Sequence, residues 1–172
     1  MDEEQKYSRV NVVKTHCPAL EISTEAVVLE SHGCDWTRFR KPDPAAVVFP
    51  RSAEQVAELV RVAAEHEIPL VPSGGRTGLS GGAVAGAGEV VVSFDRMRRV
   101  VDFNALDRTL TVEPGVVTQA IQAYAVEHNL YYPVSFAAEG SSQIGGNIAT
   151  NAGGIRVLRY GLTRDWVVGL KV

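Results

Sequence analysis

Glycine is concentrated in two short segments of this chain. The sequence holds 16 glycines in 172 residues; seven lie between Gly74 and Gly88 and five between Gly140 and Gly154. Glycine costs backbone entropy on folding, so such clusters need a structural reason. Both segments also contain apolar residues such as Leu79 and Ile144, whereas flexible linkers are usually rich in glycine and polar residues alone. We therefore expect ordered loops that approach a ligand with bare backbone, in preference to flexible surface loops.

Composition narrows the class of protein. Hydrophobic residues make up 45% and charged residues 22% of the chain, which is typical of a globular protein. The net charge of -3 argues against a broad nucleic-acid surface. Cys17 and Cys34 match no disulfide or zinc spacing, so we expect no metal site. The N-terminus lacks the apolar stretch of a signal peptide, and no apolar run reaches the length of a transmembrane segment. A cytoplasmic location is the expectation.

A strand, a helix and a second strand precede the first glycine segment. Residues 46–49 (AVVF) predict a strand and residues 68–71 (IPLV) another. Between them, Ser52 and Gln55 form a capping-box pattern at the start of a helix that ends near Glu67. Its apolar face is expected to comprise Val56, Leu59, Val60, Ala63 and Ala64. This βαβ unit should have parallel strands, and the glycine segment follows its second strand, where α/β sheets collect ligands.

The second half of the chain predicts more strands and one helix. Residues 89–94, 99–103 and 109–113 are expected to form a meander, with a turn at 104–108. Residues 118–129 predict a helix, and His66 and His128 are each expected near a helix C-terminus. Residues 130–134 and 166–172 predict further strands. A last strand without a partner would leave an open sheet edge, which favours self-association.

Familiar nucleotide motifs are missing, but an anion site is not excluded. The chain has no G-x-G-x-x-G and no Gly-Lys pair, which removes the ordinary Rossmann and Walker A loops. The amides of residues 73–78 can still curl around a phosphate. Ser73, Thr77 and Ser80 would add hydroxyl donors, and Arg76 would either add charge or face solvent.

Two longer motifs carry a family resemblance. The stretch VPSGGRTGLSGGAV resembles the pyrophosphate loop of the FAD-binding fold shared by vanillyl-alcohol oxidase and p-cresol methylhydroxylase. The stretch EGSSQIGGNIATNAGGIRVLRYG resembles the second FAD loop of the D-2-hydroxyacid dehydrogenase branch of that family. That branch holds D-2-hydroxyglutarate dehydrogenase, D-lactate dehydrogenase and the flavin subunit of glycolate oxidase. The similarity runs from about Pro42 to Val172 and includes PRSAEQVAELV and VEPGV.

The resemblance implies a fold and a set of cofactor-binding residues. The fold is α+β, a two-subdomain FAD-binding fold in which an N-terminal βαβ unit is followed by a mixed or antiparallel sheet with helices, incomplete at its C-terminal end. Residues 1–41 would be an N-terminal extension and residues 42–172 the FAD-binding domain. The residues implied around the FAD pyrophosphate are Pro72, Ser73, Gly74, Gly75, Arg76, Thr77, Gly78, Ser80 and Gly81. Those implied near adenine are Pro114 and Gly115. Those implied along the ribityl chain and flavin are Gly140, Ser141, Gly145, Gly146, Asn147, Thr150, Asn151 and Gly153. For Asn147 and Asn151, a helix or turn cap is the alternative.

The resemblance also implies an activity. The parent enzyme would oxidise a D-2-hydroxy acid of the D-lactate, glycolate or D-2-hydroxyglutarate type to the 2-oxo acid, by hydride transfer to flavin N5. An unidentified electron acceptor would then reoxidise the flavin. No catalytic acid or base is assigned in this chain, which is expected to be inactive alone, to bind FAD weakly and to self-associate. The alternatives are a non-catalytic or degenerate flavin- or nucleotide-binding module and, less favoured, the related reductase of cell-wall precursor synthesis.

The expected cofactor is FAD without a covalent bond to the protein. Some family members attach the flavin through histidine, or through histidine and cysteine. Arg76 stands where some of them place the histidine, and the second glycine segment contains neither residue type.

Overall fold

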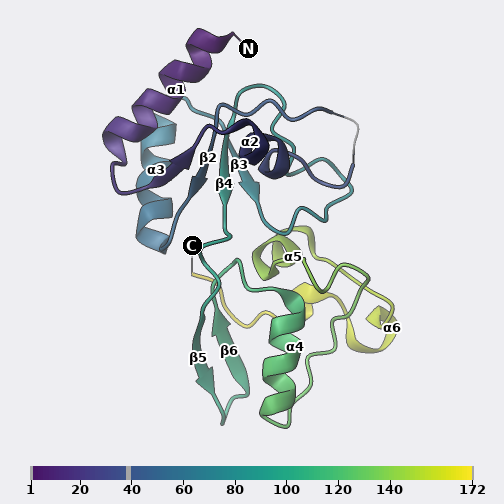
Figure 1. Ribbon diagram of the computed structural model, residues 1–172. Helices are drawn as coiled ribbons and strands as arrows, with labels where there is room; N and C mark the ends of the chain where they lie inside the picture. The colour runs from purple at the N-terminus through teal and green to yellow at the C-terminus, as the bar shows by residue number, and fades with distance from the viewer. Residues whose placement is uncertain (1, 38–39, 172) are drawn as a thin grey trace. The chain divides into compact units, whose positions relative to one another are not determined.

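The chain forms two compact units, Met1–Arg96 and Met97–Val172, in a computed structural model that describes residues 2–37 and 40–171 (Figure 1). The architecture is α+β, as predicted. The first unit holds a four-stranded mixed sheet and the second a two-stranded antiparallel sheet with helices. Among the described helices, none is long and apolar enough to cross a membrane.

The sheet of the first unit has the strand order β1-β2-β4-β3. Strands β2 (Ala46–Phe49), β4 (Val90–Ser93) and β3 (Leu70–Ser73) run parallel, and β1 (Glu21–Ser23) pairs antiparallel with β2. The predicted strand at 46–49 and the parallel direction of the βαβ strands are therefore confirmed. The predicted strand at 68–71 begins two residues later than expected. It includes Pro72, which the sheet accepts because β3 is an edge strand.

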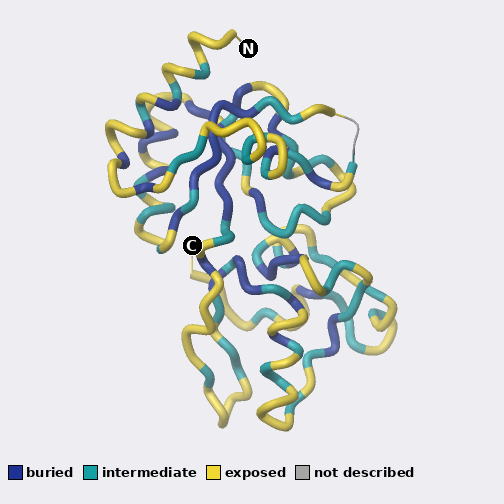
Figure 2. Tube along the Cα trace, in the orientation of Figure 1, coloured by how far each residue is buried: buried dark blue, intermediate teal, exposed yellow. Residues whose placement is uncertain are grey.

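Helices cover both faces of this sheet. Helices α1 (Glu3–His16) and α3 (Ala53–Glu65) lie on one face, and α2 (Ala26–His32) lies on the other (Figure 1). Successive valines of β2 and β4 are buried on opposite faces of the sheet. Val48 packs with Leu59 of α3 on one face, and Val47 packs with Val28 and Leu29 of α2 on the other. Figure 2 shows these strands as the dark centre of the unit. Strands buried on both faces explain the near-continuous apolar runs in the sequence.

Helix α3 begins as the sequence indicated but turns a different face to the sheet. The Ser52 hydroxyl accepts from the Gln55 amide at 3.3 Å, while the Gln55 side chain accepts from the Arg51 amide, so only half of the capping box forms. Leu59 and Ala63 are buried as predicted, but Val60 and Ala64 are exposed, and Val62 is buried instead. The i, i+3, i+4 stripe starting at Leu59 faces the sheet, because this stripe best covers the valines of β2 and β4.

Residues before the predicted domain start at residue 42 also belong to the core of the first unit. Asp2 caps the start of helix α1, and its side chain accepts from the Gln5 amide at 2.8 Å. It buries Val10 and Val13, and β1 adds a strand to the sheet. The boundary between an extension at 1–41 and a domain at 42–172 stays a prediction.

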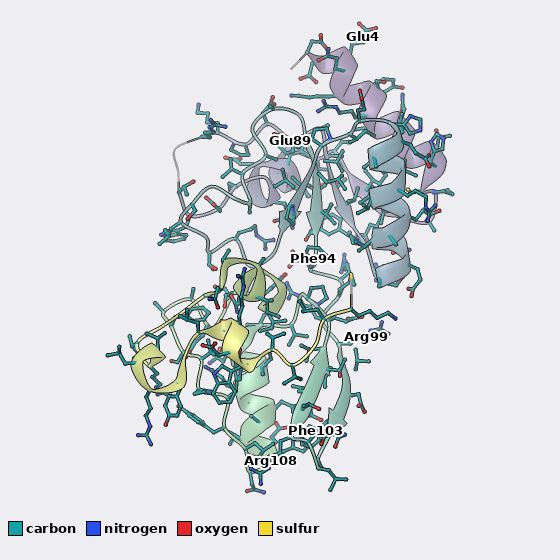
Figure 3. All side chains as sticks on the ribbon, turned by 180° about the vertical axis from the view of Figure 1, so that it is seen from behind. Glu4, Glu89, Phe94, Arg99, Phe103 and Arg108 are labelled. Carbon is teal, nitrogen blue, oxygen red and sulfur yellow. The ribbon has the colours of Figure 1, made fainter. Side chains whose placement is uncertain are left out.

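The second unit begins with a hairpin and a helix. Strands β5 (Val100–Asn104) and β6 (Thr109–Val112) pair antiparallel, and Phe103 of β5 contacts Tyr124 of helix α4 (Thr118–Glu127) (Figure 3). The turn at 104–108 is confirmed, because the Asn104 side chain accepts from the amides of the two turn residues Leu106 and Asp107. The predicted three-strand meander is wrong: β4 belongs to the sheet of the first unit.

Two other predicted strands are wrong. Residues 130–134 run as irregular chain, in which the Val134 carbonyl accepts from the Gln122 side chain of α4 instead of from a neighbouring strand. Within the predicted strand 166–172, the described residues form no strand, and Val172 lies outside them. The open sheet edge on which we based self-association therefore loses its structural basis. Three short helices follow α4 instead: α5 (Ile144–Thr150), α6 (Val157–Tyr160) and the 3-10 helix η1 (Thr163–Trp166).

Candidate functional site

The first glycine segment leaves the carboxyl end of β3. Its neighbour β4 ends at the same edge of the sheet, and the Phe94 amide donates to the Ser73 carbonyl at 3.2 Å. Residues 74–89 between these strands form an irregular loop. This is the edge of a parallel sheet at which ligands usually bind, so the position of the loop agrees with the role that the sequence predicted.

Two backbone features distinguish this loop. Arg76 and Gly81 both have positive φ, at 58° and 75°. A Cβ added to Gly81 or Gly82 would meet no atom within 4 Å. The bare backbone of Gly81 and Gly82 therefore faces open space, which gives a ligand room to approach the main chain.

The polar side chains of the loop fall into two groups. The Ser73 hydroxyl is fully buried and donates to the His32 carbonyl at 3.0 Å. The Arg76 guanidinium donates to Asp95 at 3.2 Å, so it does not simply face solvent. The Thr77 and Ser80 hydroxyls have no hydrogen-bond partner among the described residues. They are the hydroxyl donors that remain available to a ligand.

Asp35 lies next to Gly78 of the same loop. The Trp36 amide donates to the Gly78 carbonyl at 2.9 Å, which ties the loop to residues 35–37. One carboxylate oxygen of Asp35 accepts from the amide and hydroxyl of Thr37 at 2.8 and 2.7 Å. The other oxygen is buried and has no hydrogen-bond partner among the residues that the structure describes. A Cβ on Gly78 would lie 3.5 Å from that oxygen.

The second glycine segment is partly helical, not a loop throughout. It is brought against Pro114 and Gly115 within the second unit. The Gly145 amide donates to the Pro114 carbonyl at 2.9 Å, and a Cβ on Gly145 would lie 2.7 Å from the Pro114 Cβ. The Ile144 amide donates to the Val116 carbonyl in the same way. Two predicted parts of the site, 114–115 and 145–146, are therefore neighbours.

Asn147, in the middle of α5, is buried in a polar cluster with Thr118 and Ser142. Its Nδ2 donates to the Thr118 hydroxyl at 2.6 Å, and the Thr118 and Ser142 hydroxyls lie 2.7 Å apart. Thr118 is fully buried and lies at the first turn of α4. The cluster joins α4 and α5, so the amide nitrogen of Asn147 has a structural partner within the unit.

The far end of α5 is capped. Asn151 adopts a left-handed conformation with φ 51° as the C-cap, and its side-chain oxygen accepts from the Arg164 amide at 3.0 Å. The Arg164 guanidinium donates to the carbonyls of Ile148 and Ala149 at 2.8 and 2.7 Å. This is the capping alternative that the sequence left open for Asn151. Thr150 donates to the Gly146 carbonyl at 2.9 Å.

The remaining predicted residues of this segment differ in exposure to a ligand. A Cβ on Gly146 would meet nothing within 4 Å, so this glycine of α5 is open. A Cβ added to Gly140 would lie 3.3 Å from the Gln119 side chain, and a Cβ added to Gly153 would lie 2.6 Å from the Leu162 side chain. The Ser141 hydroxyl donates to the Ala138 carbonyl at 3.4 Å. Whether each of these residues contacts a cofactor stays a prediction.

Several titratable side chains of the second unit have shifted pKa values, among them Glu113 and Tyr132. Burial opposes ionisation of Glu113, but hydrogen bonds from the Arg99 side chain and amide outweigh it and hold the pKa of Glu113 below its usual value. Burial raises the pKa of Tyr132 to about 12. Glu113 directly precedes Pro114 and Gly115, which were predicted to lie near adenine. Its ion pair with Arg99 therefore holds the backbone just before these two residues in place.

Sequence reasoning missed several residues that hold the two segments. Asp95 and His32 contact Arg76 and Ser73 in the first unit, and Thr118, Ser142 and Arg164 hold α5 in the second. Asp95 had only a partial signal, because it follows the predicted strand at 89–94, while its place beside the glycine loop depends on the pairing of β3 with β4. Arg164 had none, since its partners are main-chain carbonyls.

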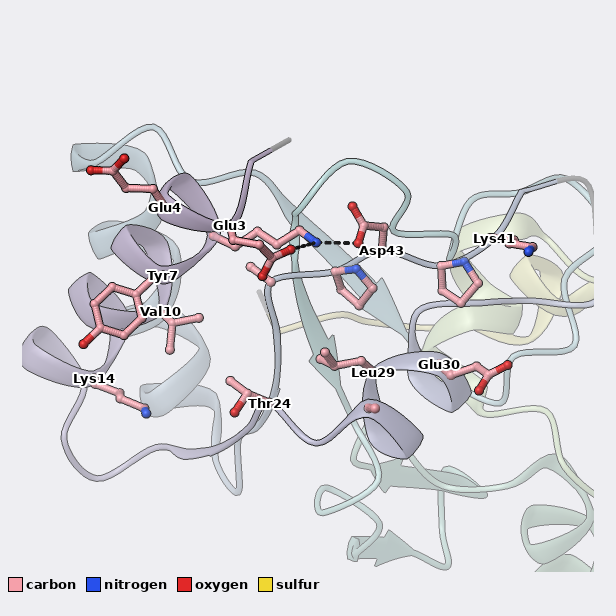
Figure 4. Close-up of a pocket in the computed structure, with 15 residues that line it drawn as sticks. Glu3, Glu4, Tyr7, Val10, Lys14, Thr24, Leu29, Glu30, Lys41 and Asp43 are labelled. Atoms are coloured by element: carbon pink, nitrogen blue, oxygen red, sulfur yellow. Dashed lines mark hydrogen bonds and ion pairs between the residues drawn. The ribbon is translucent and has the colours of Figure 1, made fainter.

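The first unit also contains an open cavity that is separate from the predicted residues. It has a volume of about 990 Å³ and lies among α1, α2 and residues 41–45 (Figure 4). Lys6 donates to Glu3 and Asp43 at its rim. No predicted cofactor-binding residue lines it. Among the described residues, no group of three or more His, Cys, Asp or Glu side chains could hold a metal ion.

Comparison with protein families identifies the class. Residues 44–172 match the family described as "FAD binding domain", which takes in both glycine segments. The chain belongs to this family of FAD-binding domains. The prediction that FAD is the cofactor is thereby confirmed, and the open backbone at Gly81, Gly82 and Gly146 fits such a ligand.

Particular relatives support the branch that the motifs indicated. The chain is 56% identical over 163 residues to a D-2-hydroxyglutarate dehydrogenase of Stutzerimonas stutzeri, covering 95% of this chain and 35% of the relative. It is 38% identical over 129 residues to glycolate oxidase subunit GlcD of Bacillus subtilis, covering 75% of this chain and 27% of the relative. The chain thus spans about a third of the length of the curated relatives that it matches.

Solved structures confirm the fold. An alkyldihydroxyacetonephosphate synthase superposes with a TM-score of 0.80 at 20% identity, covering 92% of this chain and 31% of the other. A chitooligosaccharide oxidase gives a TM-score of 0.75 at 20% identity, covering 90% and 33%. At these identities the likeness concerns the fold alone.

Proposed function

We propose that this chain is the FAD-holding part of an enzyme that oxidises a D-2-hydroxy acid to the matching 2-oxo acid. The observation that carries the proposal is the 56% identity to D-2-hydroxyglutarate dehydrogenase over 95% of the chain. D-2-Hydroxyglutarate is therefore the first substrate to test, followed by D-lactate and glycolate, since a probable D-lactate dehydrogenase of Danio rerio and glycolate oxidase subunits are also relatives.

The residues of each unit support distinct roles in holding FAD. In the first unit, the amides of residues 74–78 suit an anionic pyrophosphate, as do the hydroxyls of Thr77 and Ser80, for which the described part of the chain offers no partner. In the second unit, the open backbone at Gly146 suits a flat ring or a ribityl chain, because no Cβ stands in the way. When bound, FAD supplies the acceptor for the hydride that leaves the hydroxyl-bearing carbon of the substrate.

The protein's part in this reaction is orientation. The fixed ends of α5, held by Thr118 on one side and Arg164 on the other, keep Gly146 in place. We assign no catalytic acid or base in this chain. An electron acceptor of unidentified class would complete the cycle, and we propose that the flavin is held without a covalent bond, in a cytoplasmic protein.

The proposed activity is tested by mixing the candidate acids, without oxygen, with FAD-loaded protein that is as long as its relatives. D-2-Hydroxyglutarate, D-lactate or glycolate should bleach the flavin absorption, and L-2-hydroxyglutarate, the matched control, should not. Flavin that stays oxidised with all of these acids would contradict the proposed reaction and favour a module that binds flavin without turnover.

A further inference from the structure

The sequence assigned Arg76 to the pyrophosphate of FAD, yet its side chain is tied into the protein. We propose that Asp95 and His32 anchor Arg76, and that this Asp95 anchor fixes the first glycine segment in the conformation that binds phosphate. Arg76 is then a positioning residue, and the loop binds the anion through its amides and hydroxyls. The inference rests on the proposed FAD binding and adds residues to it.

The anchor is a shared carboxylate at the carboxyl edge of the sheet. Oδ2 of Asp95, two residues after β4, accepts from Arg76 Nη1 at 3.2 Å and lies 3.2 Å from His32 Nε2. The three side chains are only 19%, 27% and 16% exposed, respectively. Partly buried charge pairs are less screened by water and salt than surface pairs, so this contact can hold a loop in place.

The backbone conformation of Arg76 explains why an anchor is needed at this residue. Arg76 has φ 58°, a left-handed conformation that is unfavourable for a residue with a Cβ. Such a conformation persists only where surrounding contacts enforce it. A left-handed residue can turn successive amides toward a common point, and amides turned in this way make a concave anion site. The side-chain bond to Asp95 and the amide geometry are therefore linked through one residue.

His32 joins the anchor from a second element. It is the last residue of α2, and its carbonyl accepts from the buried hydroxyl of Ser73 at the end of β3. Its Nδ1 lies 3.1 Å from the Val28 carbonyl and 3.0 Å from the Ser31 hydroxyl, and its ring meets Phe49 edge-on. The ring is thus fixed on both sides, so the start of the glycine segment is held by α2 and by β4.

The anchor also explains how a negatively charged Asp95 can lie beside a site that binds phosphate. An ionised Asp95 beside the loop would repel a pyrophosphate if it stood alone. The guanidinium of Arg76 offsets that charge, and so the positive charge of Arg76 is used within the protein. If Arg76 instead bound the phosphate, Asp95 would compete for it. The two assignments predict opposite effects of neutralising Asp95.

FAD affinity of variants separates these assignments. Asp95→Asn and Arg76→Gln should each weaken FAD binding to the 172-residue chain by about tenfold, as expected when a charge-assisted contact that organises a site is lost. The double variant should bind no worse than Asp95→Asn alone, because Asp95→Asn already breaks the contact that Arg76→Gln removes. Asp102→Asn, on the exposed face of β5, is the matched control and should bind FAD as the unchanged chain does.

The salt dependence of FAD affinity is a second measurement, because it would become weaker if a positively charged phosphate ligand were lost. Arg76→Gln should keep the salt dependence of the unchanged chain, since no phosphate contact is removed. Tighter FAD binding by Asp95→Asn, or a weaker salt dependence for Arg76→Gln, would overturn the proposal and make Arg76 a direct phosphate ligand.

Trypsin tests the anchor without FAD. Cleavage after Arg76 should become several-fold faster in Asp95→Asn and in His32→Gln, because the released loop opens more often. Cleavage after Arg108, in the hairpin turn of the second unit, should not change and reports general unfolding. Equal cleavage after Arg76 in all variants would overturn the anchor. A chain that shows faster cleavage after Arg76 in the variants but binds no FAD would retain the anchor and contradict the proposed function instead.

Discussion

The two glycine-rich segments have similar compositions but different reasons for their glycines. In the first, Gly81 and Gly82 face open space in an irregular loop. In the second, Gly145 and Gly154 lie against neighbouring backbone, and a Cβ on Gly154 would fall 1.8 Å from the Ser135 carbonyl oxygen. Glycine therefore leaves open space beside the backbone in one segment and mainly allows close packing in the other. Gly146, which is open, is the exception within the second segment.

The segments also differ in how they are held. The first is held at its start by the side chains of Ser73, Arg76 and Asp95, and further along by main-chain bonds such as that from the Trp36 amide to the Gly78 carbonyl. The second is held by amides that reach Pro114 and Val116, by the buried Thr118 cluster and by Arg164 at the end of α5. Substitutions should therefore damage cofactor binding first in one segment and folding first in the other.

The largest effect is expected at Gly154. Gly154→Ala should destabilise the chain by about 3 kcal/mol or more, because backbone at Ser135 cannot move aside as a flexible side chain would. Gly82→Ala is the matched control and should change the free energy of unfolding little, since its Cβ meets no atom. Denaturant unfolding measures both. Equal stability of the two variants would remove the distinction between packed and open glycines.

Thr118→Val should have the next largest effect. It removes the hydroxyl that accepts from Asn147 and leaves buried polar groups without a partner, at a cost of about 1 to 3 kcal/mol. Thr111→Val, on an exposed position of β6, makes the same chemical change without that cluster. Urea midpoints that are the same for both variants would show that the cluster contributes nothing to holding α5.

Gly146→Ala sharpens the comparison, because stability and affinity should move in opposite directions. Alanine in the middle of α5 should stabilise the chain without FAD by about 0.5 to 1 kcal/mol, since it lowers the entropy of the unfolded state. The added Cβ enters the space proposed for the cofactor, so the dissociation constant for FAD should rise about tenfold. Thermal unfolding and FAD titration on one preparation check both. Raised stability with unchanged affinity would place the cofactor away from Gly146.

The smallest effect concerns acid. Because the pKa of Glu113 is lowered in the folded chain, its contribution to stability is present above the usual glutamate pKa of about 4.3 and is lost as pH falls through the lower folded value. Glu113→Gln should reduce the loss of stability on acidification in that window. Unfolding curves at several pH values measure this. A variant with the same acid dependence as the unchanged chain would show that the pair with Arg99 is not linked to folding.

Local elements of the fold were predictable where the signal lies within a few residues. The strand at Ala46–Phe49 was found at its predicted bounds, and His66 and His128 follow helices α3 and α4 as their C-caps. Pairing was not predictable in the same way. Residues 89–94 predict a strand correctly, but only long-range contacts decide that β4 lies between β2 and β3 and not in a meander. Residues 130–134 have the composition of a strand and lack a partner.

The candidate site was predictable in outline. Glycine clusters and family motifs locate both segments, and the family match includes them. They do not say which glycines face a ligand, because that depends on distant neighbours such as Pro114 and Ser135. Nor do they reveal Asp95, whose role arises from the pairing of β3 with β4.

Titration of FAD into the purified 172-residue chain tests the central claim most directly. We predict a weak but saturable change in the visible flavin absorption, and denaturation should release all of the yellow colour from the polypeptide. A folded chain that leaves the FAD spectrum unchanged at every concentration would contradict the account that these two segments hold the cofactor. Colour that stays with the denatured polypeptide would contradict non-covalent binding.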